Sequence, residues 1–452
     1  MQVTETARDG LKRTLKIVVD QAELSQRFSV RLDELKDRVQ LKGFRKGKVP
    51  VPHLKKMYGK GLMQEVLEQA VSESSAKAVK DRNERPAQQP TIEIDDAKEG
   101  VFERIVAGQA DLAFSMSFEV LPPIPVADLS SLKLERLVAD VDDEAVEKAL
   151  NELADRNVTF AVEDGRAASN GDMVTLDFKG TLDGEAFEGG AAEGANLVLG
   201  KGQFIPGFED GMIGAKAGEA RTVNGTFPAE YPMKNLAGKT AQFDVTVKAV
   251  SKPNRPAIDE DFAAGLGTEN LAKLKELVAA QIKREYDQAS RMKLKRELLD
   301  ELDKAHTFDL PASLVDFEFD NIWKQLTNNL AATNKTFADE GKTEDEARAE
   351  YRGIAARRVR LGLVIGEIGE KNKLSVTQDE LRRALIERAR QFPGQEKMVY
   401  EYYEKQQGAL AELRAPIFED KVVDHVLEQA KPIEKKVTKD ELFKAVEETT
   451  ER

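Results

Sequence analysis

Residues 171–190 read GDMVTLDFKGTLDGEAFEGG, and they indicate how the middle of the chain folds. Val174, Leu176 and Phe178 alternate with polar residues, as in a strand with one buried face. The glycines around them mark tight turns. The wider segment 151–250 holds 15 of the chain's 31 glycines, a density typical of a small domain of short strands. A second alternating run lies near its end, at Phe243, Val245 and Val247.

Three stretches of this segment, in a fixed order, resemble the macrolide-binding (FKBP) class of peptidyl-prolyl isomerases. They are residues 171–190, residues 197–211 (LVLGKGQFIPGFEDG) and residues 243–250. The resemblance implies a bent antiparallel sheet around one short helix, with an apolar pocket between them. The pocket residues it implies are Phe178, Phe187, Phe204, Ile205, Phe208, Tyr231 and Phe243, with Glu188 at the polar edge.

The chemistry of such a pocket requires no nucleophile and no general base. Isomerisation of an X-Pro bond breaks no covalent bond, and its barrier of about 18–20 kcal/mol is lost amide resonance. A catalyst must bind the twisted amide better than either planar form. We therefore expect a prolyl isomerase without metal or cofactor. The alternative is that the aromatic residues form only a core. Phe178, Phe208 and Glu188 depart from the Tyr, Trp and Asp usual in small isomerases of this class.

The first 120 residues are predicted to form an α+β domain. Alternation at Leu15, Ile17 and Val19 predicts a strand, and so does the longer alternation over residues 112–120. Helices are predicted over residues 21–39 and 62–79, with a loop rich in basic residues between them.

That loop contains GFRKGKVP at residues 43–50. Residues 36–60 carry nine Lys or Arg and one acid, whereas the whole chain has a net charge of −13. A basic tip on an acidic protein predicts an acidic partner, for which nucleic acid phosphate is the first candidate. The alternative is an ordinary solvated loop.

The octapeptide matches every fixed position of G-F-R-x-G-K-x-P, and so resembles the signature of the bacterial trigger factor family, chaperones of the ribosomal tunnel exit. The resemblance implies docking on ribosomal protein and ribosomal RNA of the large subunit, chiefly through Phe44, Arg45 and Lys46. The full ribosome-binding set it implies is Gly43, Phe44, Arg45, Lys46, Gly47, Lys48 and Pro50.

From about residue 260 onward the spacing is helical. Apolar residues recur every three or four positions from Leu271 to Ala289, and Thr377 with Glu380 forms a capping box, as Thr438 does with Glu441. The last ten residues are expected to fray. We interpret Trp323 as a core residue. For a second, mostly aromatic cluster we favour a contact between helices over an exposed helix tip. That cluster is Met398, Tyr400, Tyr402 and Tyr403.

Taken over the whole chain, the resemblance predicts an elongated multidomain α+β protein. Its helical part implies a body with two arms that hold unfolded nascent polypeptides through scattered apolar patches. The expected segments are a docking domain (1–120), a linker (121–150), an FKBP-type domain (151–252), a helical chaperone domain (253–432) and a tail (433–452).

Composition excludes several function classes. There is no Cys, so disulfide and thiolate chemistry are excluded. The three histidines, His53, His306 and His425, lie far apart and predict no metal site. No G-x-x-x-x-G-K-[ST] loop occurs, so a nucleotide-driven machine is not expected. The start lacks a long apolar run and no stretch of about 18 apolar residues occurs, which predicts a cytoplasmic protein without a membrane partner.

Two other functions fit parts of the sequence. A free cytoplasmic FKBP-type isomerase with helical dimerisation arms predicts no ribosome binding. A nucleic-acid module with an inactive isomerase fold predicts tight RNA binding, but the single basic loop argues against it. The oligomeric state stays open, and a homodimer that hides the loops away from the ribosome is one possibility.

Overall fold

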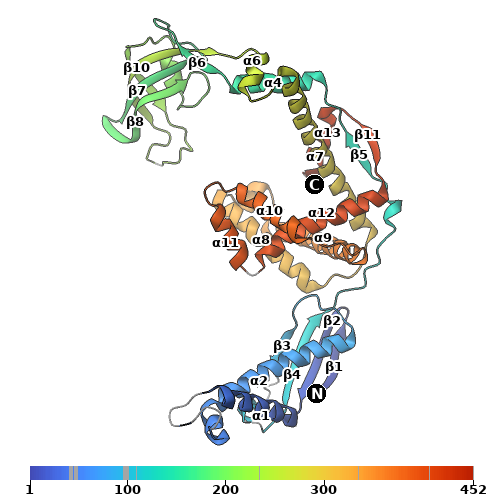
Figure 1. Ribbon diagram of the computed structural model, residues 1–452. Helices are drawn as coiled ribbons and strands as arrows, with labels where there is room; N and C mark the ends of the chain where they lie inside the picture. The colour runs from blue at the N-terminus through green and yellow to red at the C-terminus, as the bar shows by residue number, and fades with distance from the viewer. Residues whose placement is uncertain are drawn as a thin grey trace. The chain divides into compact units, whose positions relative to one another are not determined.

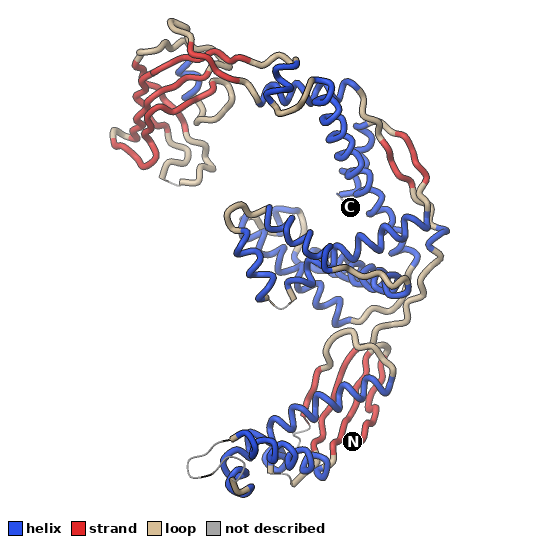
Figure 2. The backbone as a smooth tube through the Cα atoms, in the orientation of Figure 1, coloured by secondary structure: helices blue, strands red, loops and turns tan. Residues whose placement is uncertain are grey.

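The structure is a computed structural model of the 452-residue chain. It describes residues 1–39, 44, 49–94, 101–107, 109–233, 235–333, 335–406 and 408–450. Figure 1 labels the helices and strands, and Figure 2 shows helix, strand and loop along the backbone. Contacts divide the chain into two compact units, residues 1–136 with 293–434 and residues 137–292 with 435–452.

The N-terminal part of the first unit is a four-stranded sheet, β1-β2-β4-β3, with helices packed on one face. Leu15 and Ile17 of β2, and Phe114 and Met116 of β4, are fully buried, as their alternation predicted. Each such side chain contributes roughly 1.5–3 kcal/mol. The elements are β1 (Gln2–Asp9), β2 (Lys12–Val19), α1 (Gln21–Arg38), α2 (Val51–Arg82), β3 (Thr91–Ile94), α3 (Val101–Val106) and β4 (Leu112–Glu119).

Helix α2 begins at Val51, well before the predicted start at Leu62. Pro52 lies in its first turn, where the missing N–H has no helical acceptor to lose and the fixed φ suits a helix. The basic residues Lys55 and Lys60 therefore lie on the helix, and the loop is shorter than the basic stretch.

The middle of the second unit is a five-stranded antiparallel sheet in the order β6-β10-β7-β8, with β9 also paired to β10. A short helix, α5, packs with this sheet around one buried core, as the sequence predicted. The elements are β6 (Thr159–Val162), β7 (Met173–Leu182), β8 (Glu185–Val198), α5 (Phe208–Met212), β9 (Ala220–Thr226) and β10 (Thr240–Asn254).

The C-terminal half is largely helical, as expected. Leu298, Val364 and Val426, from three different helices, are fully buried in one core of the first unit. The predicted capping box at Thr377 is present, with Glu380 bonded back to the Thr377 N–H at 2.8 Å. The helices are α6 (Glu260–Gly265), α7 (Leu271–Ala305), α8 (Ala312–Thr333), α9 (Glu344–Lys371), α10 (Gln378–Arg390), α11 (Glu396–Lys405) and α12 (Ala409–Ala430).

The segment between the two sheets packs on these helices instead of running free. Leu134 is buried in the helical core, and the Ala127 N–H donates to Nε2 of the buried His306 at 3.2 Å. His306 is thus a structural residue, as its isolation in the sequence predicted. The segment carries a 3-10 turn (Leu129–Ser131), β5 (Glu135–Val138) and α4 (Asp143–Arg156).

The end of the chain differs from the prediction. Residues 433–436 form β11 (Ile433–Lys436), which pairs with β5, and α13 (Lys439–Thr450) follows. Leu442 of α13 is fully buried, and the Phe443 ring lies 5.9 Å from that of Tyr286. The expectation that the last ten residues fray is therefore wrong for residues 443–450, because their apolar face packs on α7.

Candidate functional site

A pocket of about 700 Å³ opens beside α5 in the second unit. Seven of the eight side chains predicted for the isomerase site line it, and they come from β7, β8, β10, the loop before α5 and the loop after β9. They are Phe178, Phe187, Glu188, Phe204, Ile205, Tyr231 and Phe243.

The eighth, Phe208, lies beneath the others and is fully buried. Its ring stacks on that of Phe204, with the centroids 4.8 Å apart, and meets the Phe243 ring edge-on, with the centroids 5.2 Å apart. Gly207 before it adopts a φ of +90°, and a Cβ there would lie 2.8 Å from the Asn224 carbonyl oxygen. Only glycine fits this turn, which places Phe208 as the support of the pocket floor.

The walls depend on close ring packing. Phe187 and Phe243 meet edge-on with their centroids 6.1 Å apart. Gly180 faces both, because a Cβ there would lie 2.6 Å from the Phe243 ring and 2.9 Å from the Phe187 ring. The absence of a side chain at Gly180 therefore lets the two rings approach each other across β7.

Several lining residues had no signal in the sequence. Phe227 is buried, and its ring lies 4.7 Å from Tyr231 and 5.8 Å from Phe187. It follows β9 directly and belongs to no alternating run, so periodicity did not identify it. Met233 and Leu236, from the loop that follows, also line the pocket.

Glu209 of α5 was also missed. Its carboxylate accepts four backbone N–H groups of the loop that carries Phe204: Gly200 (2.8 Å), Gly202 (3.1 Å), Gln203 (2.6 Å) and Phe204 (3.1 Å). Burial raises the pKa of this carboxyl, but the four backbone donors outweigh burial and hold the pKa below its usual value of 4.5. Glu209 thus positions one wall of the pocket.

We expect Glu209→Gln to destabilise the isomerase domain by about 1–2 kcal/mol and to lower isomerase activity, because an amide cannot accept four donors. Since the folded-state pKa is lowered, the stabilisation is present above pH 4.5 and is lost as the pH falls through the folded pKa. Thermal unfolding at neutral and acidic pH measures it. The difference between wild type and variant should shrink on acidification. A constant difference would contradict the assignment.

The second predicted site is only partly described. Phe44 is exposed, and its ring lies 5.4 Å from that of His53 on the first turn of α2. Val49 is buried in the domain core, and Pro50 caps α2. The other predicted docking residues lie outside the described residues: Gly43, Arg45, Lys46, Gly47 and Lys48.

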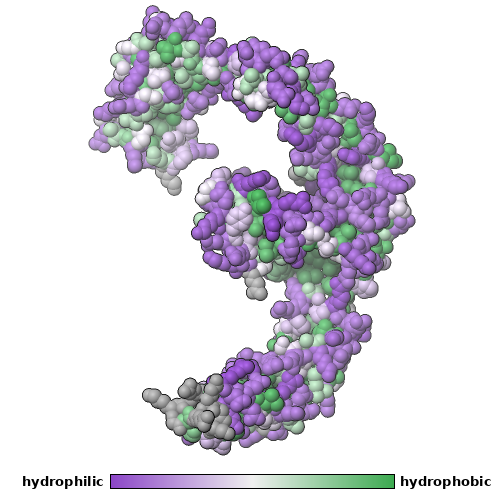
Figure 3. All heavy atoms as spheres, in the orientation of Figure 1, coloured by the Kyte–Doolittle hydropathy of each residue, from purple (hydrophilic) through white to green (hydrophobic). Residues whose placement is uncertain are grey.

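The helical region exposes apolar side chains in separate places, which Figure 3 shows as scattered hydrophobic patches on the face in view. Met398, Tyr400 and Tyr402 are exposed and only Tyr403 is buried, so the predicted helix–helix contact is wrong for three of the four. Trp323 instead packs in a cluster, as predicted. Its ring stacks on Phe319 and Phe337, with the Arg348 guanidinium 4.4 Å from its centroid.

Within the described part of the chain, no group of three or more His, Cys, Asp or Glu is placed to hold a metal ion. No helix among the described residues is long and apolar enough to cross a bilayer.

Comparisons with known proteins cover nearly the whole chain. Residues 1–153 match the family model of the bacterial trigger factor protein, 164–248 that of FKBP-type peptidyl-prolyl cis-trans isomerase, and 270–428 that of the trigger factor C-terminus. The chain is 51% identical to the trigger factor of Azorhizobium caulinodans over 99% of both chains. It is 52% identical to that of Afipia carboxidovorans over 98% of both chains.

A solved structure of the trigger factor chaperone aligns with 95% of this chain and 100% of its own, with a TM-score of 0.57 at 21% identity. At this identity the likeness shows the fold alone.

The antiparallel sheet, short helix and aromatic pocket define a peptidyl-prolyl cis-trans isomerase domain of the FKBP type, which in the sequence follows the N-terminal α+β domain and precedes the helical region. The chain belongs to the bacterial trigger factor family. It is a ribosome-associated chaperone with isomerase activity. Because the match to trigger factors extends over the full length of the chain, the alternative of a free isomerase without a ribosome role is not favoured.

Proposed function

We propose that the three parts of the chain divide the work of a nascent-chain chaperone. The aromatic pocket isomerises X-Pro bonds, the GFRKGKVP loop docks the protein on the ribosome, and the helical region holds unfolded clients without ATP. The observation that carries the proposal is the gathering of seven predicted side chains around one apolar pocket in a family member.

In the isomerase site, the rings of Phe178, Phe187 and Phe243 form the walls and Phe208 supports the floor. A prolyl ring seated there leaves water, and the amide before it twists in an apolar environment. Binding energy that is larger for the twisted amide than for the planar one lowers the barrier. Glu188 and Tyr231 lie at the lining, where they meet the polar backbone of the substrate.

In the docking loop, Phe44, Arg45 and Lys46 contact the large subunit at the tunnel exit. Arg45 and Lys46 meet phosphates of ribosomal RNA, because guanidinium and ammonium groups bind phosphate oxygens strongly. Phe44, whose side chain is exposed, packs on ribosomal protein. Gly43, Gly47, Lys48 and Pro50 complete the loop.

A photo-reactive amino acid at position 44 tests this assignment. Irradiation with ribosomes should link the protein to a large-subunit protein beside the tunnel exit. The same amino acid at Phe392, an exposed phenylalanine of the helical region, serves as the control. Cross-links from position 44 only to small-subunit components, or none, would contradict the docking role.

Clients are held by exposed apolar side chains of the helical region, such as Phe317, Met398 and Tyr402. Separated patches give weak, distributed contacts that accept many sequences and release them without nucleotide. We assign docking to residues 1–120, the linker to 121–150, isomerisation to 151–252, client holding to 253–432 and the tail to 433–452.

The proposed compartment is the cytoplasm, where nascent chains leave the ribosome. We also infer that free protein forms a homodimer that covers its docking loops. Equilibrium sedimentation of the chain alone tests this, since a mass that rises with concentration supports dimerisation and a constant monomer mass contradicts it.

A further inference from the structure

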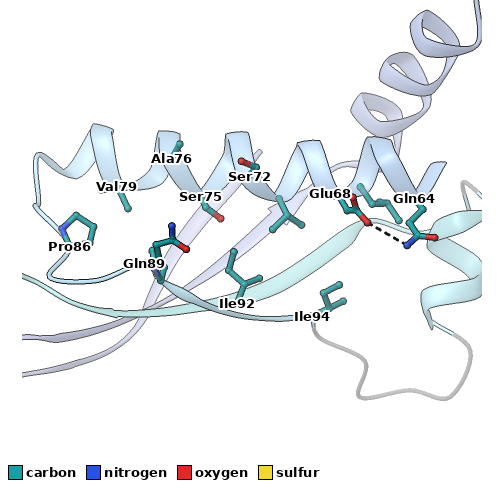
Figure 4. A pocket seen from close by; sticks show the side chains of 13 residues that line it. Gln64, Glu68, Ser72, Ser75, Ala76, Val79, Pro86, Gln89, Ile92 and Ile94 are labelled. Atoms are coloured by element: carbon teal, nitrogen blue, oxygen red, sulfur yellow. Dashed lines mark hydrogen bonds between the residues drawn. The ribbon is translucent and has the colours of Figure 1, made fainter. Parts of the chain in front are cut away.

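The N-terminal domain contains a second large cavity, which the functions above do not use. A groove of about 930 Å³ runs between α2 and β3, the last strand of the sheet. Figure 4 shows side chains of α2 on one side and Ile92 and Ile94 of β3 on the other. The lining is mostly apolar, and Glu68 is the one charged side chain among the described residues that line it.

At the groove, the face of the sheet that α2 covers is no longer fully buried. Two cross-strand rows run over this face. One row joins Leu15, Met116 and Ile92 on β2, β4 and β3, and the other joins Ile17, Phe114 and Ile94. The first two members of each row are fully buried, but Ile92 is 38% and Ile94 is 42% exposed.

The backbone of β3 is open on the same side. Among the described strands β3 pairs only with β4, so its other edge offers N–H and C=O groups that pair with no other described strand. The opposite edge of the sheet is protected differently. There one row ends at Glu5 of β1, which forms an ion pair with Arg82 of α2. Within the part of the chain that the structure describes, no charged side chain continues either row beyond Ile92 or Ile94.

A polar group in the groove lacks a partner. Ser75 of α2 lines the groove and is 8% exposed, and its hydroxyl oxygen has no hydrogen-bond partner within the part of the chain that the structure describes. Figure 4 shows this hydroxyl pointing from α2 toward the strand. A buried hydroxyl without a partner is costly, and a polar group entering the groove would satisfy it.

From these features we infer that the groove binds an extended, apolar polypeptide segment, which adds to β3 as a fifth strand. Its backbone pairs with the open edge of β3, and alternate apolar side chains continue the two rows beneath α2. Glu68, which Figure 4 places above Ile94, selects a Lys or Arg at that end of the segment. The inference rests on the proposed function only for the source of the segment, a client polypeptide.

The test uses the full chain without ribosomes, so its result is independent of ribosome docking. The probe is a synthetic peptide of about eight residues in which Ile and Thr alternate, with capped ends. A Lys at its N-terminal end lies beside Ile94 when the peptide runs antiparallel to β3. A second probe carries N-methyl groups on alternate amides and cannot pair along a strand edge.

Peptide binding is followed by fluorescence anisotropy, and its location by amide hydrogen exchange of residues 91–94. We expect the first probe to slow exchange at β3 and the N-methylated probe to bind at least about tenfold more weakly. Ile94→Lys should weaken binding about tenfold, because it puts a charge in the apolar row. Val3→Lys is the matched control, since Val3 ends the same row on β1 and is 39% exposed.

A charge exchange separates recognition from mere stability. Glu68→Lys should weaken binding of the probe that ends in Lys and strengthen binding of the same peptide ending in Glu. A damaged fold cannot produce this reversal. The inference is overturned if exchange at β3 is unchanged at saturating probe, or if the N-methylated probe binds equally well. It is also overturned if Ile94→Lys only converts a dimer to a monomer, which would make a second copy the occupant.

Discussion

Replacement of Phe208 by Ala is expected to destabilise the isomerase domain by about 3–5 kcal/mol and to abolish prolyl isomerase activity. Phe208 is fully buried, and its ring contacts those of Phe178, Phe204 and Phe243. The truncation leaves a cavity under the pocket and frees three rings that now hold each other in place. Differential scanning calorimetry and an X-Pro peptide assay measure the two effects.

Phe392→Ala is the matched control, because the same truncation at a 40% exposed phenylalanine removes little packing. It should leave both the unfolding transition of the isomerase domain and its activity unchanged. Phe208→Trp tests the role of the floor separately. It keeps an aromatic ring and should retain measurable activity. If Phe208→Ala were as active as wild type, the pocket described here would not be the isomerase site.

The second large effect is expected at the docking loop. Phe44→Ala/Arg45→Ala/Lys46→Ala should weaken ribosome binding by roughly 10- to 100-fold, because it removes two phosphate-binding cations and one exposed aromatic anchor. The dependence of affinity on salt should also flatten, by about 1.5 to 2 in the slope of log K against log salt. Titration of labelled protein with ribosomes at several salt concentrations measures both.

The helical region offers a control that also loses two cations and one phenylalanine. Arg388→Ala/Arg390→Ala/Phe392→Ala removes two arginines and one exposed phenylalanine, and the Arg388 guanidinium lies 5.3 Å from the Phe392 ring centroid. It should leave ribosome affinity and its salt slope unchanged. Equal losses in both triple variants would show a non-specific charge effect and contradict specific docking.

The sequence predicted those elements whose side chains alternate between core and solvent. Strands β2 and β4 carry Leu15, Ile17, Phe114 and Met116 at every second position, and each is fully buried. Strand β1 was not predicted, because every one of its residues is exposed and no hydrophobic period exists to detect. An edge strand of this kind depends on its pairing with β2, which is not a local property of the sequence.

The eight pocket residues, Phe208 included, were predicted from motif resemblance, whereas Glu209, which positions one wall, was not. Glu209 lies in an acidic dipeptide like many others, and its role appears only where four backbone N–H groups converge on it. The start of helix α13 was predicted by its capping box, but the last ten residues were expected to fray because nothing in the sequence identifies the residues against which they pack. Tyr286, the residue against which this helix packs, lies far away in the chain.

The central claim is that one chain carries two separable activities, ribosome docking and prolyl isomerisation. The most direct test measures ribosome co-sedimentation and isomerase rate on the same two variants, Phe44→Ala/Arg45→Ala/Lys46→Ala and Phe208→Ala. The predicted result is that the loop variant stays in the supernatant with wild-type isomerase activity, while Phe208→Ala pellets with ribosomes and is inactive. A loop variant that pellets like wild type, or either variant losing both activities, would contradict the account.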